Sequence, residues 1–187
     1  MMEFVLVTSN PNKWVEAQRI LGCPLARVAL DLPEIQAATT GEVALHKARA
    51  AHERLGRAVI VEDTGVELLA FGGFPGPFIK FWEALGGLGS ICRALDAAGD
   101  RGAVAVCALG VCTGEGAYIV EGRAAGAIAR EPRGAGGFGW DSIFLPEGND
   151  RTFAELGAEE KDRISHRLLA WRELSRKLGL SLPASSL

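Results

Sequence analysis

The sequence predicts an α/β fold in which a mixed sheet is flanked by helices, and three observations carry this prediction. A short apolar run, 3–8, ends in the turn SNPNK and leads into a segment of helical character, 12–21. A second helical segment, 39–56, is followed by an apolar strand, 57–65. Two strand-like runs surround TGEG within 103–129, as in a hairpin. This order is typical of a mixed α/β sheet.

The helix expected over 39–56 carries the clearest local signals. Thr39 and Glu42 have the spacing of a capping box, and Gly56 stands where glycine commonly ends a helix. Before this helix, LARVALDL (25–32) could form a second strand, and PEIQAA (33–38) has the composition of a loop.

The strand over 57–65 is expected to end at two acids, Glu62 and Asp63. The segment FGGFPGPF (71–78) that follows is too rich in glycine and proline for regular structure. The next segment, 80–99, predicts a helix, a break and a second helix.

In the second half of the chain, the alternation of strands and helices gives way to the two strand-like runs of the hairpin. We expect the hairpin to form a separate antiparallel lobe, followed by a loop over 130–144 and one closing helix over 159–179. The sequence contains no internal repeat and no low-complexity linker. It therefore predicts one domain over 1–187 with two lobes.

Composition limits the function classes. The chain has 187 residues and a formal net charge of −3, which argues against long nucleic acid as the main partner but not against a small anion. No apolar run approaches the roughly 20 residues of a membrane helix, and the N-terminus lacks the pattern of a signal peptide. We expect a cytoplasmic protein that does not enter a membrane.

The cysteines predict a reducing compartment rather than a zinc site. None of the four forms a C-x-x-C pair, and Cys107 and Cys112 are placed by strand alternation on opposite faces. We expect buried, inert thiols at Cys23, Cys92, Cys107 and Cys112.

The turn TSNPNK could bind phosphate. Thr8, Ser9, Asn10 and Lys13 lie between a strand and a helix, where free N–H groups and the helix dipole favour an anion. The alternative is plain helix capping by Ser9 or Asn10. The segment lacks the glycine pattern of a P-loop.

Three acids could hold a metal ion. Glu34, Glu62 and Asp63 offer the oxygen ligands that Mg²⁺ prefers, together with substrate phosphates. Ligands of α/β sheets bind outside the carboxyl ends of strands, and a carboxylate there could also deprotonate a water. The alternative is a solvated strand end.

Lysines Lys47, Lys80 and Lys161 are individually compatible with a solvated surface, although Lys80 follows the unusual segment FPGPFI. In SHR (165–167), a regular helix places Arg167 inside an apolar wedge, where arginine must snorkel, find an acid or face a ligand. The same helix places His166 on the opposite side, as a solvated histidine, so the three side chains of Ser165, His166 and Arg167 would not converge.

The segment GGFGWDSIF (136–144) carries two rings, Phe138 and Trp140, separated by Gly139 and followed by Asp141. Taken alone, it could be a turn that packs both rings into the core. The glycines would instead let the backbone approach a ligand closely, and the two rings need not share one role.

Together these segments resemble the inosine triphosphate pyrophosphatase family. The resemblance rests on TSNPNKWVE, LPEIQ, VEDTGVELLAFGGFPGPFIK, GGFGWDSIF and EEKDRISHR, which occur in family order from residue 8 to residue 167. It implies a mixed, elongated sheet in two lobes with the nucleotide in the cleft, and usually a homodimer. The implied activity is Mg²⁺-dependent hydrolysis of ITP, dITP and XTP to the monophosphate and pyrophosphate.

The resemblance also implies roles for single residues. The turn from Thr8 to Lys13 would hold phosphates, and Lys47 and Lys80 would neutralise them. Asp63 would be both a metal ligand and the proton acceptor, beside the metal candidates Glu34 and Glu62. The remaining substrate-binding candidates are Thr64, Gly65, Phe138, Gly139, Trp140, Asp141, Lys161, Ser165, His166 and Arg167.

Two positions depart from the family pattern without removing a proposed functional group. Ser142 stands where proline is frequent, and Asp162 stands in the neighbourhood of a frequent asparagine. Other function classes stay open at this point. They are a pyrophosphatase for other nucleotides, a non-catalytic nucleotide-binding module, and a structural or partner-binding protein.

Overall fold

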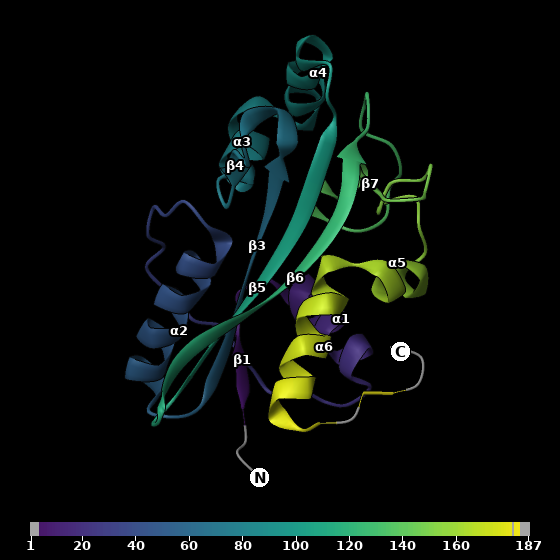
Figure 1. The fold of residues 1–187 in the computed structure, drawn as a ribbon. Helices are drawn as coiled ribbons and strands as arrows, with labels where there is room; N and C mark the ends of the chain where they lie inside the picture. Colours follow the sequence, from purple (N-terminus) through teal and green to yellow (C-terminus); the bar gives the residue numbers. More distant parts are fainter. Residues whose placement is uncertain (1–3, 181, 184–187) are drawn as a thin grey trace.

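A twisted seven-stranded mixed sheet forms the centre of the computed structural model, which describes residues 4–180 and 182–183 (Figure 1). The strand order is β2-β1-β3-β5-β6-β7, and β4 pairs with β3 away from this path. The strands are β1 (Val5–Val7), β2 (Arg27–Val28), β3 (Val59–Leu68), β4 (Pro75–Gly76), β5 (Gly102–Thr113), β6 (Gly116–Ile128) and β7 (Phe144–Pro146).

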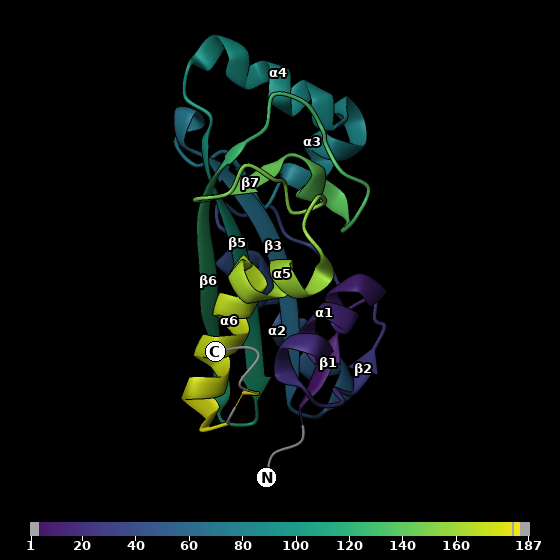
Figure 2. The ribbon, with the colours of Figure 1, turned by 90° about the vertical axis from the view of Figure 1, so that its right-hand side faces the viewer.

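Helices cover both faces of this sheet, which confirms the predicted α/β class. α2 packs on one face, while α1 and α6 pack on the other, and α3 and α4 lie at the end where β5 begins (Figures 1 and 2). None of the described helices is long and apolar enough to cross a membrane. The helices are α1 (Pro11–Leu21), α2 (Thr40–Leu55), α3 (Ile79–Gly86), α4 (Leu88–Ala98), α5 (Ala158–Ile164) and α6 (His166–Leu178).

Strand alternation divides the core between the two faces. Val5 and Val59 pack with α2, whereas Leu6 and Ile60 pack with α1 and α6. A third cluster fills the end of the sheet that α4 covers. The same alternation separates Cys107 from Cys112, as predicted. Cys23 is exposed, so the expectation of a buried thiol there is wrong.

The N-terminal strand–turn–helix unit is confirmed. β1 runs parallel to both β2 and β3, and Asn10 caps α1 by accepting a hydrogen bond from the Asn12 N–H at 2.9 Å. Glu3, the expected start of the strand, lies outside the described residues. The second strand, expected over 25–32, is only two residues long. The capping box of Thr39 and Glu42 is present at the start of α2.

The expectation that β3 ends at Glu62 and Asp63 is wrong. The strand continues to Leu68 because β5 pairs with it at every step, including Glu62 opposite Leu109. On the other side, β1 pairs with β3 only as far as Val61. The two acids therefore lie in mid-strand, just past the point where one neighbouring strand has stopped.

The predicted hairpin is confirmed as β5 and β6, but it is not a separate lobe. β5 pairs with β3 from Val59 opposite Cys112 to Leu68 opposite Ala103, so the hairpin belongs to the common sheet. The division of the domain into two lobes with a nucleotide between them stays a prediction. The segment expected as a loop over 130–144 contains a short 3₁₀ turn, Gly139–Ser142, before β7 begins.

The single closing helix expected over 159–179 is instead two helices. Ser165 adopts an extended backbone, with φ −77° and ψ 154°, and its hydroxyl caps α6 by accepting from the Leu168 N–H at 3.2 Å. The break resets the helical register. His166 and Arg167 are consequently both buried, and the expectation that His166 faces solvent is wrong.

Gly122 lets α6 approach the sheet. A side chain at this position on β6 would collide with the backbone of His166 and Ala170. We expect Gly122→Ala to lower the free energy of unfolding by about 1–3 kcal/mol, a typical cost of overpacking. Urea denaturation measures this change. Gly114→Ala is the control, since nothing lies within 4 Å of that position. Equal stability of the two variants would contradict the packing described here.

Candidate active site

A pocket of about 370 Å³ opens where β1 ends and β3 continues with β5 as its neighbour. Its walls come from the turn after β1, the middle of β3, the loop before α2, the start of α3, the 3₁₀ turn at 139–142 and the start of α6. Most of the predicted site residues line it: Thr8, Ser9, Asn10, Lys13, Glu34, Lys47, Glu62, Asp63, Thr64, Lys80, Phe138, Gly139, Trp140, Asp141, His166 and Arg167.

Three predicted residues lie outside this pocket. Gly65 faces Thr40 and Gly76, where a side chain would not fit. Ser165 is buried as the cap of α6. Lys161 is buried beside the pocket and lines a second hollow of about 270 Å³.

The turn after β1 combines helix capping with a cation. Asn10 caps α1, which is the alternative to phosphate binding that the sequence left open. The backbone N–H of Asn10 donates to Thr8 Oγ1 at 3.1 Å. Lys13, one helical turn further on, directs its ammonium group into the pocket. It lies 3.4 Å from the carbonyl oxygen and 3.6 Å from the Oε1 of Glu62.

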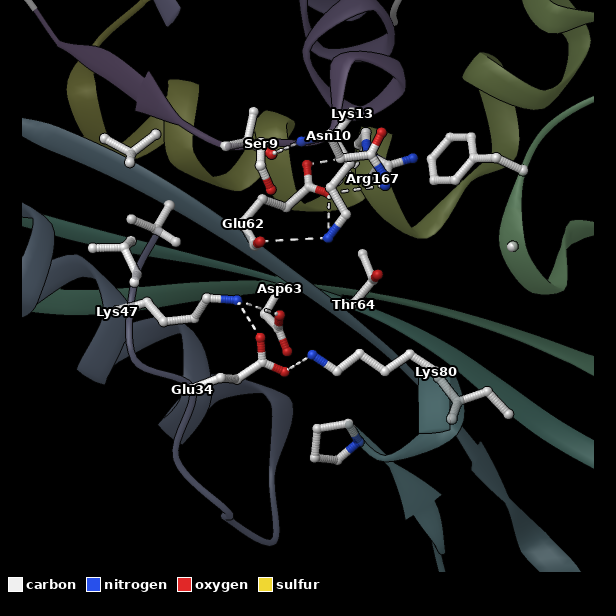
Figure 3. A pocket seen from close by; sticks show the side chains of 18 of the residues that line it. Ser9, Asn10, Lys13, Glu34, Lys47, Glu62, Asp63, Thr64, Lys80 and Arg167 are labelled. Carbon is white, nitrogen blue, oxygen red and sulfur yellow. Dashed lines mark hydrogen bonds and ion pairs between the residues drawn. The ribbon is translucent and has the colours of Figure 1, made fainter. Parts of the chain in front are cut away.

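Two lysines and two carboxylates meet on the α2 side of β3 (Figure 3). Lys47 Nζ lies 3.0 Å from Glu34 Oε2 and 3.2 Å from Asp63 Oδ1. Lys80 reaches Glu34 from the opposite side and pairs with its other oxygen, Oε1. We call Glu34, Lys47, Asp63 and Lys80 the phosphate-side cluster, in view of the predicted role of its lysines.

The donor set of this cluster fits Mg²⁺. Glu34 and Asp63 already converge on one cation, the ammonium group of Lys47. The described residues contain no group of three or more metal-ligating side chains, but Mg²⁺ usually takes one or two carboxylates and completes its shell with phosphates and water. Glu62 lies on the opposite face of β3 and binds Arg167, so Glu34 and Asp63 are the better-placed candidates.

Asp63 is a buried carboxylate in the wall of the pocket. Burial raises the pKa of Asp63 above its ordinary value of 3.8, although Lys13 and Lys47 act in the opposite direction. Lys47 is also the hydrogen-bond donor that orients its Oδ1. A carboxylate of raised pKa is a better general base at neutral pH than an ordinary aspartate.

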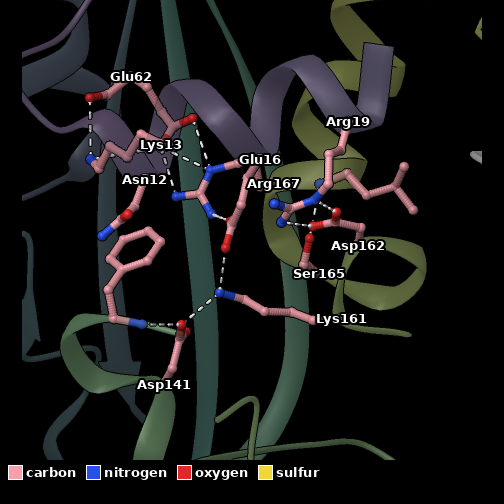
Figure 4. Close-up of polar contacts among 12 residues, drawn as sticks. Asn12, Lys13, Glu16, Arg19, Glu62, Asp141, Lys161, Asp162, Ser165 and Arg167 are labelled. Carbon is pink, nitrogen blue, oxygen red and sulfur yellow. Dashed lines mark hydrogen bonds and ion pairs between the residues drawn. The ribbon is translucent and has the colours of Figure 1, made fainter. Parts of the chain in front are cut away.

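A buried charge network occupies the other face of β3 (Figure 4). The Arg167 guanidinium donates to both oxygens of Glu62 at 2.8–3.1 Å and also pairs with Glu16. Lys161 Nζ bonds to Glu16 at 2.9 Å and to Asp141 at 2.6 Å. The sequence left Arg167 three possibilities: to snorkel, to pair with an acid or to face a ligand. In the structure it pairs with acids. We call these five residues the buried network.

Glu16 is the member that sequence reasoning missed. It is 5% exposed and connects both buried cations. Its signal was available in the sequence, since it lies four residues before the buried Ile20 and three after Lys13 on one face of α1. An acid on the apolar face of a helix needs a partner, as the arginine of α6 did.

The two rings of GGFGWDSIF play different parts. Trp140 is buried against Phe144 and His166, with ring centroids 5.7 and 5.1 Å apart. Phe138 is only half-buried and lines both hollows. Its N–H donates to Asp141 Oδ2 at 2.8 Å, so the residue that binds Lys161 also fixes the ring. Lys161 Nζ lies 4.9 Å from the ring centroid.

His166 presents a neutral ring to the pocket. Burial, followed by the charges of Arg167 and Lys161, holds the pKa of His166 well below its ordinary value of 6.5. Neither ring nitrogen has a hydrogen-bond partner among the described residues. A buried polar group of this kind calls for an explanation, and a ligand that fills the pocket would supply one.

Glu16→Gln tests the buried network. Burial raises the pKa of Glu16, but Arg167 and Lys161 outweigh burial and keep this pKa below the ordinary 4.5. The carboxylate therefore contributes stability that is fully present above about pH 4.5 and is lost as pH falls through its folded-state pKa. We expect Glu16→Gln to cost about 3–5 kcal/mol of unfolding free energy at pH 7. The difference from the unaltered chain should narrow below about pH 4.5.

Urea denaturation across a pH series measures both effects. Glu173→Gln is the control, because that carboxylate pairs with Arg176 at the surface. A Glu16→Gln variant as stable as this control at pH 7 would contradict the role of Glu16.

The chain is similar in sequence to the Ham1 family and to proteins named as pyrophosphatases. A model of the Ham1 family matches residues 4–177. The dITP/XTP pyrophosphatase of Methanopyrus kandleri is 44% identical over 174 residues, which cover 90% of this chain and 92% of that protein. The inosine triphosphate pyrophosphatase of Batrachochytrium dendrobatidis is 42% identical, with 91% and 90% covered.

Solved structures agree with these sequences. A HAM1 protein from Coxiella burnetii superposes with a TM-score of 0.82 at 33% identity, covering 96% of this chain and 99% of that one. The nucleoside-triphosphatase/dITP/XTP pyrophosphatase of Mycobacterium abscessus gives a TM-score of 0.72 at 35% identity, with 95% and 100% covered. Because the family match spans nearly the whole described chain and relatives above 40% identity cover 90–91% of it, the chain belongs to the Ham1 family.

Proposed function

We propose that the chain hydrolyses the non-canonical purine nucleotides dITP, ITP and XTP to the nucleoside monophosphate and pyrophosphate. The names of its relatives support this substrate class. The observation that carries the proposal is the pocket itself. It places a half-buried aromatic ring at one end and, at the other, two convergent carboxylates with three lysines.

Glu34 and Asp63 would hold Mg²⁺, which when bound would neutralise phosphate charge and orient the triphosphate. The rest of the chemistry falls to the chain itself. Lys13, Lys47 and Lys80 would bind the phosphate oxygens, and the turn at Ser9 would add hydrogen bonds. In phosphoryl transfer, positioning and charge neutralisation supply most of the catalysis.

Asp63 would act as the general base. It would accept a proton from the water that attacks the α-phosphorus. The bond from that phosphorus to the bridging oxygen breaks, and pyrophosphate leaves while the new oxygen stays on the monophosphate. The position of Asp63 supports this role, because its carboxylate lines the pocket and is oriented by Lys47.

The purine base of the substrate would bind beside the buried network and its neighbours. Phe138 would stack on the purine, a contact that binds every base and selects none. Three nitrogens of Arg167 already bond to Glu16 and Glu62, so its guanidinium is not free to read the 6-oxo group of the purine. We infer that Arg167 positions the site. The unpartnered ring of His166 is then the better-placed reader.

We further propose a cytoplasmic homodimer. The resemblance to the family supports the dimer. The buried thiols of Cys92 and Cys107 suit a reducing compartment. The formal charge of −3 supports a small nucleotide, rather than long nucleic acid, as the partner.

Pyrophosphate release tests the proposed function. The unaltered chain is assayed with XTP, ITP, dITP, GTP and ATP, with and without Mg²⁺. We expect release from the first three, little from GTP and ATP, and none without the metal. Preference for GTP, ATP or pyrimidine nucleotides would favour a pyrophosphatase of another class, and binding without release would favour a nucleotide-binding module.

The same assay tests Asp63. We expect Asp63→Asn to lower kcat about 100-fold or more, in the range of general-base contributions. Asp96→Asn is the control, since Asp96 lies on α4 outside the pocket and pairs there with Arg101. Turnover of Asp63→Asn close to that of the control would exclude Asp63 as the base.

A further inference from the structure

The phosphate-side cluster is internally neutral. Its two lysines are paired with its two carboxylates, and each Glu34 oxygen holds a different lysine. Lys47 lies between Glu34 and Asp63, in the position where a cation would bridge them. The cations expected to attract phosphate are therefore already neutralised by the acids expected to hold the metal.

The pair of Lys80 and Glu34 is the most open to exchange. The side chains of Lys80 and Glu34 are 49% and 28% exposed, so their pairing contributes little net stability. The buried network differs in this respect, since all its side chains are 7% exposed or less. A ligand can thus rearrange the phosphate-side cluster while the opposite face of β3 keeps its pairing.

From this arrangement, and resting on the proposed function, we propose that the cluster is a partner-exchange device that makes triphosphate binding depend on a divalent cation. Without the cation, Glu34 and Asp63 occupy Lys47 and Lys80, and a polyphosphate must compete with them. With the cation, the two carboxylates take it as their partner, and both ammonium groups turn to the phosphates. Each ligand then raises the affinity for the other, as reciprocal coupling requires.

The coupling predicts that neutralising Glu34 will free Lys80, and will remove one of the two carboxylates that hold Lys47, without any metal. Glu34→Gln removes the charge that both lysines share. Glu83→Gln is the matched control, because Glu83 lines the same pocket but pairs with no lysine among the described residues. The two variants remove equal charge from the pocket, but only the first releases Lys80 and leaves Lys47 with Asp63 as its one remaining carboxylate in the cluster.

Calorimetric titration with inorganic tripolyphosphate provides a readout that is independent of turnover. It is run in EDTA and again with excess Mg²⁺, on the unaltered chain and both variants, after thermal denaturation has verified that each is folded. We expect Mg²⁺ to tighten binding by the unaltered chain at least about tenfold, the effect of one charge-assisted hydrogen bond. We expect Glu34→Gln to gain about tenfold in EDTA on the same basis and to lose most of its response to Mg²⁺.

Three outcomes would overturn the exchange. They are equal affinity of the unaltered chain in EDTA and in Mg²⁺, a gain by Glu34→Gln no larger than that by Glu83→Gln, and no binding in either buffer. The proposed function is tested separately by pyrophosphate release. An active chain that fails the titration disproves the exchange alone, and an inactive chain that passes it disproves the proposed function alone.

Discussion

The alternation of side chains along β3 is the constraint on which the rest of the site depends. Glu62 and Asp63 are neighbours in sequence, but the strand turns them to opposite faces. β1 stops beside Val61 while β5 continues, so the pocket can open on one side of the strand without interrupting it. A single strand thereby supplies an acid to the buried network and another to the phosphate-side cluster.

The two groups of charges differ in burial, and this difference assigns them different roles. In the buried network, losing one partner leaves an uncompensated charge in a medium of low polarity, so the geometry around Arg167 is held firmly. That rigidity fixes Asp141 and, through it, the backbone that carries Phe138. In the phosphate-side cluster, solvent reaches Lys80 and Glu34 and weakens their pair, so Lys80 can change partners. One face of β3 is rigid and suits the purine base, and on the other face ion pairs can be exchanged for phosphates. Together the two faces suit hydrolysis of a nucleoside triphosphate.

Local signals in the sequence predicted the fold well and the site in part. The capping box at Thr39, the hairpin turn and the apolar wedge around Arg167 each depend on short-range physics that a single sequence contains. The break at Ser165 was missed because the segments on both sides of it are helical, and only the serine cap shows that a new helix begins. The continuation of β3 past Asp63 depends on its pairing with β5, some 45 residues later, which no local pattern records. Glu16 lay on the apolar face of its helix and could have been found by the argument applied to Arg167.

The coupling between Glu62 and Arg167 tests the central claim most directly, because this pair ties β3 to α6. A double-mutant cycle of Glu62→Gln and Arg167→Met, measured by urea denaturation at pH 7, isolates their interaction from other effects of each change. If the buried pair organises the site, the coupling free energy should be about 2–3 kcal/mol, as for contacting residues in one network. A coupling below about 0.5 kcal/mol, the value for independent sites, would contradict this account.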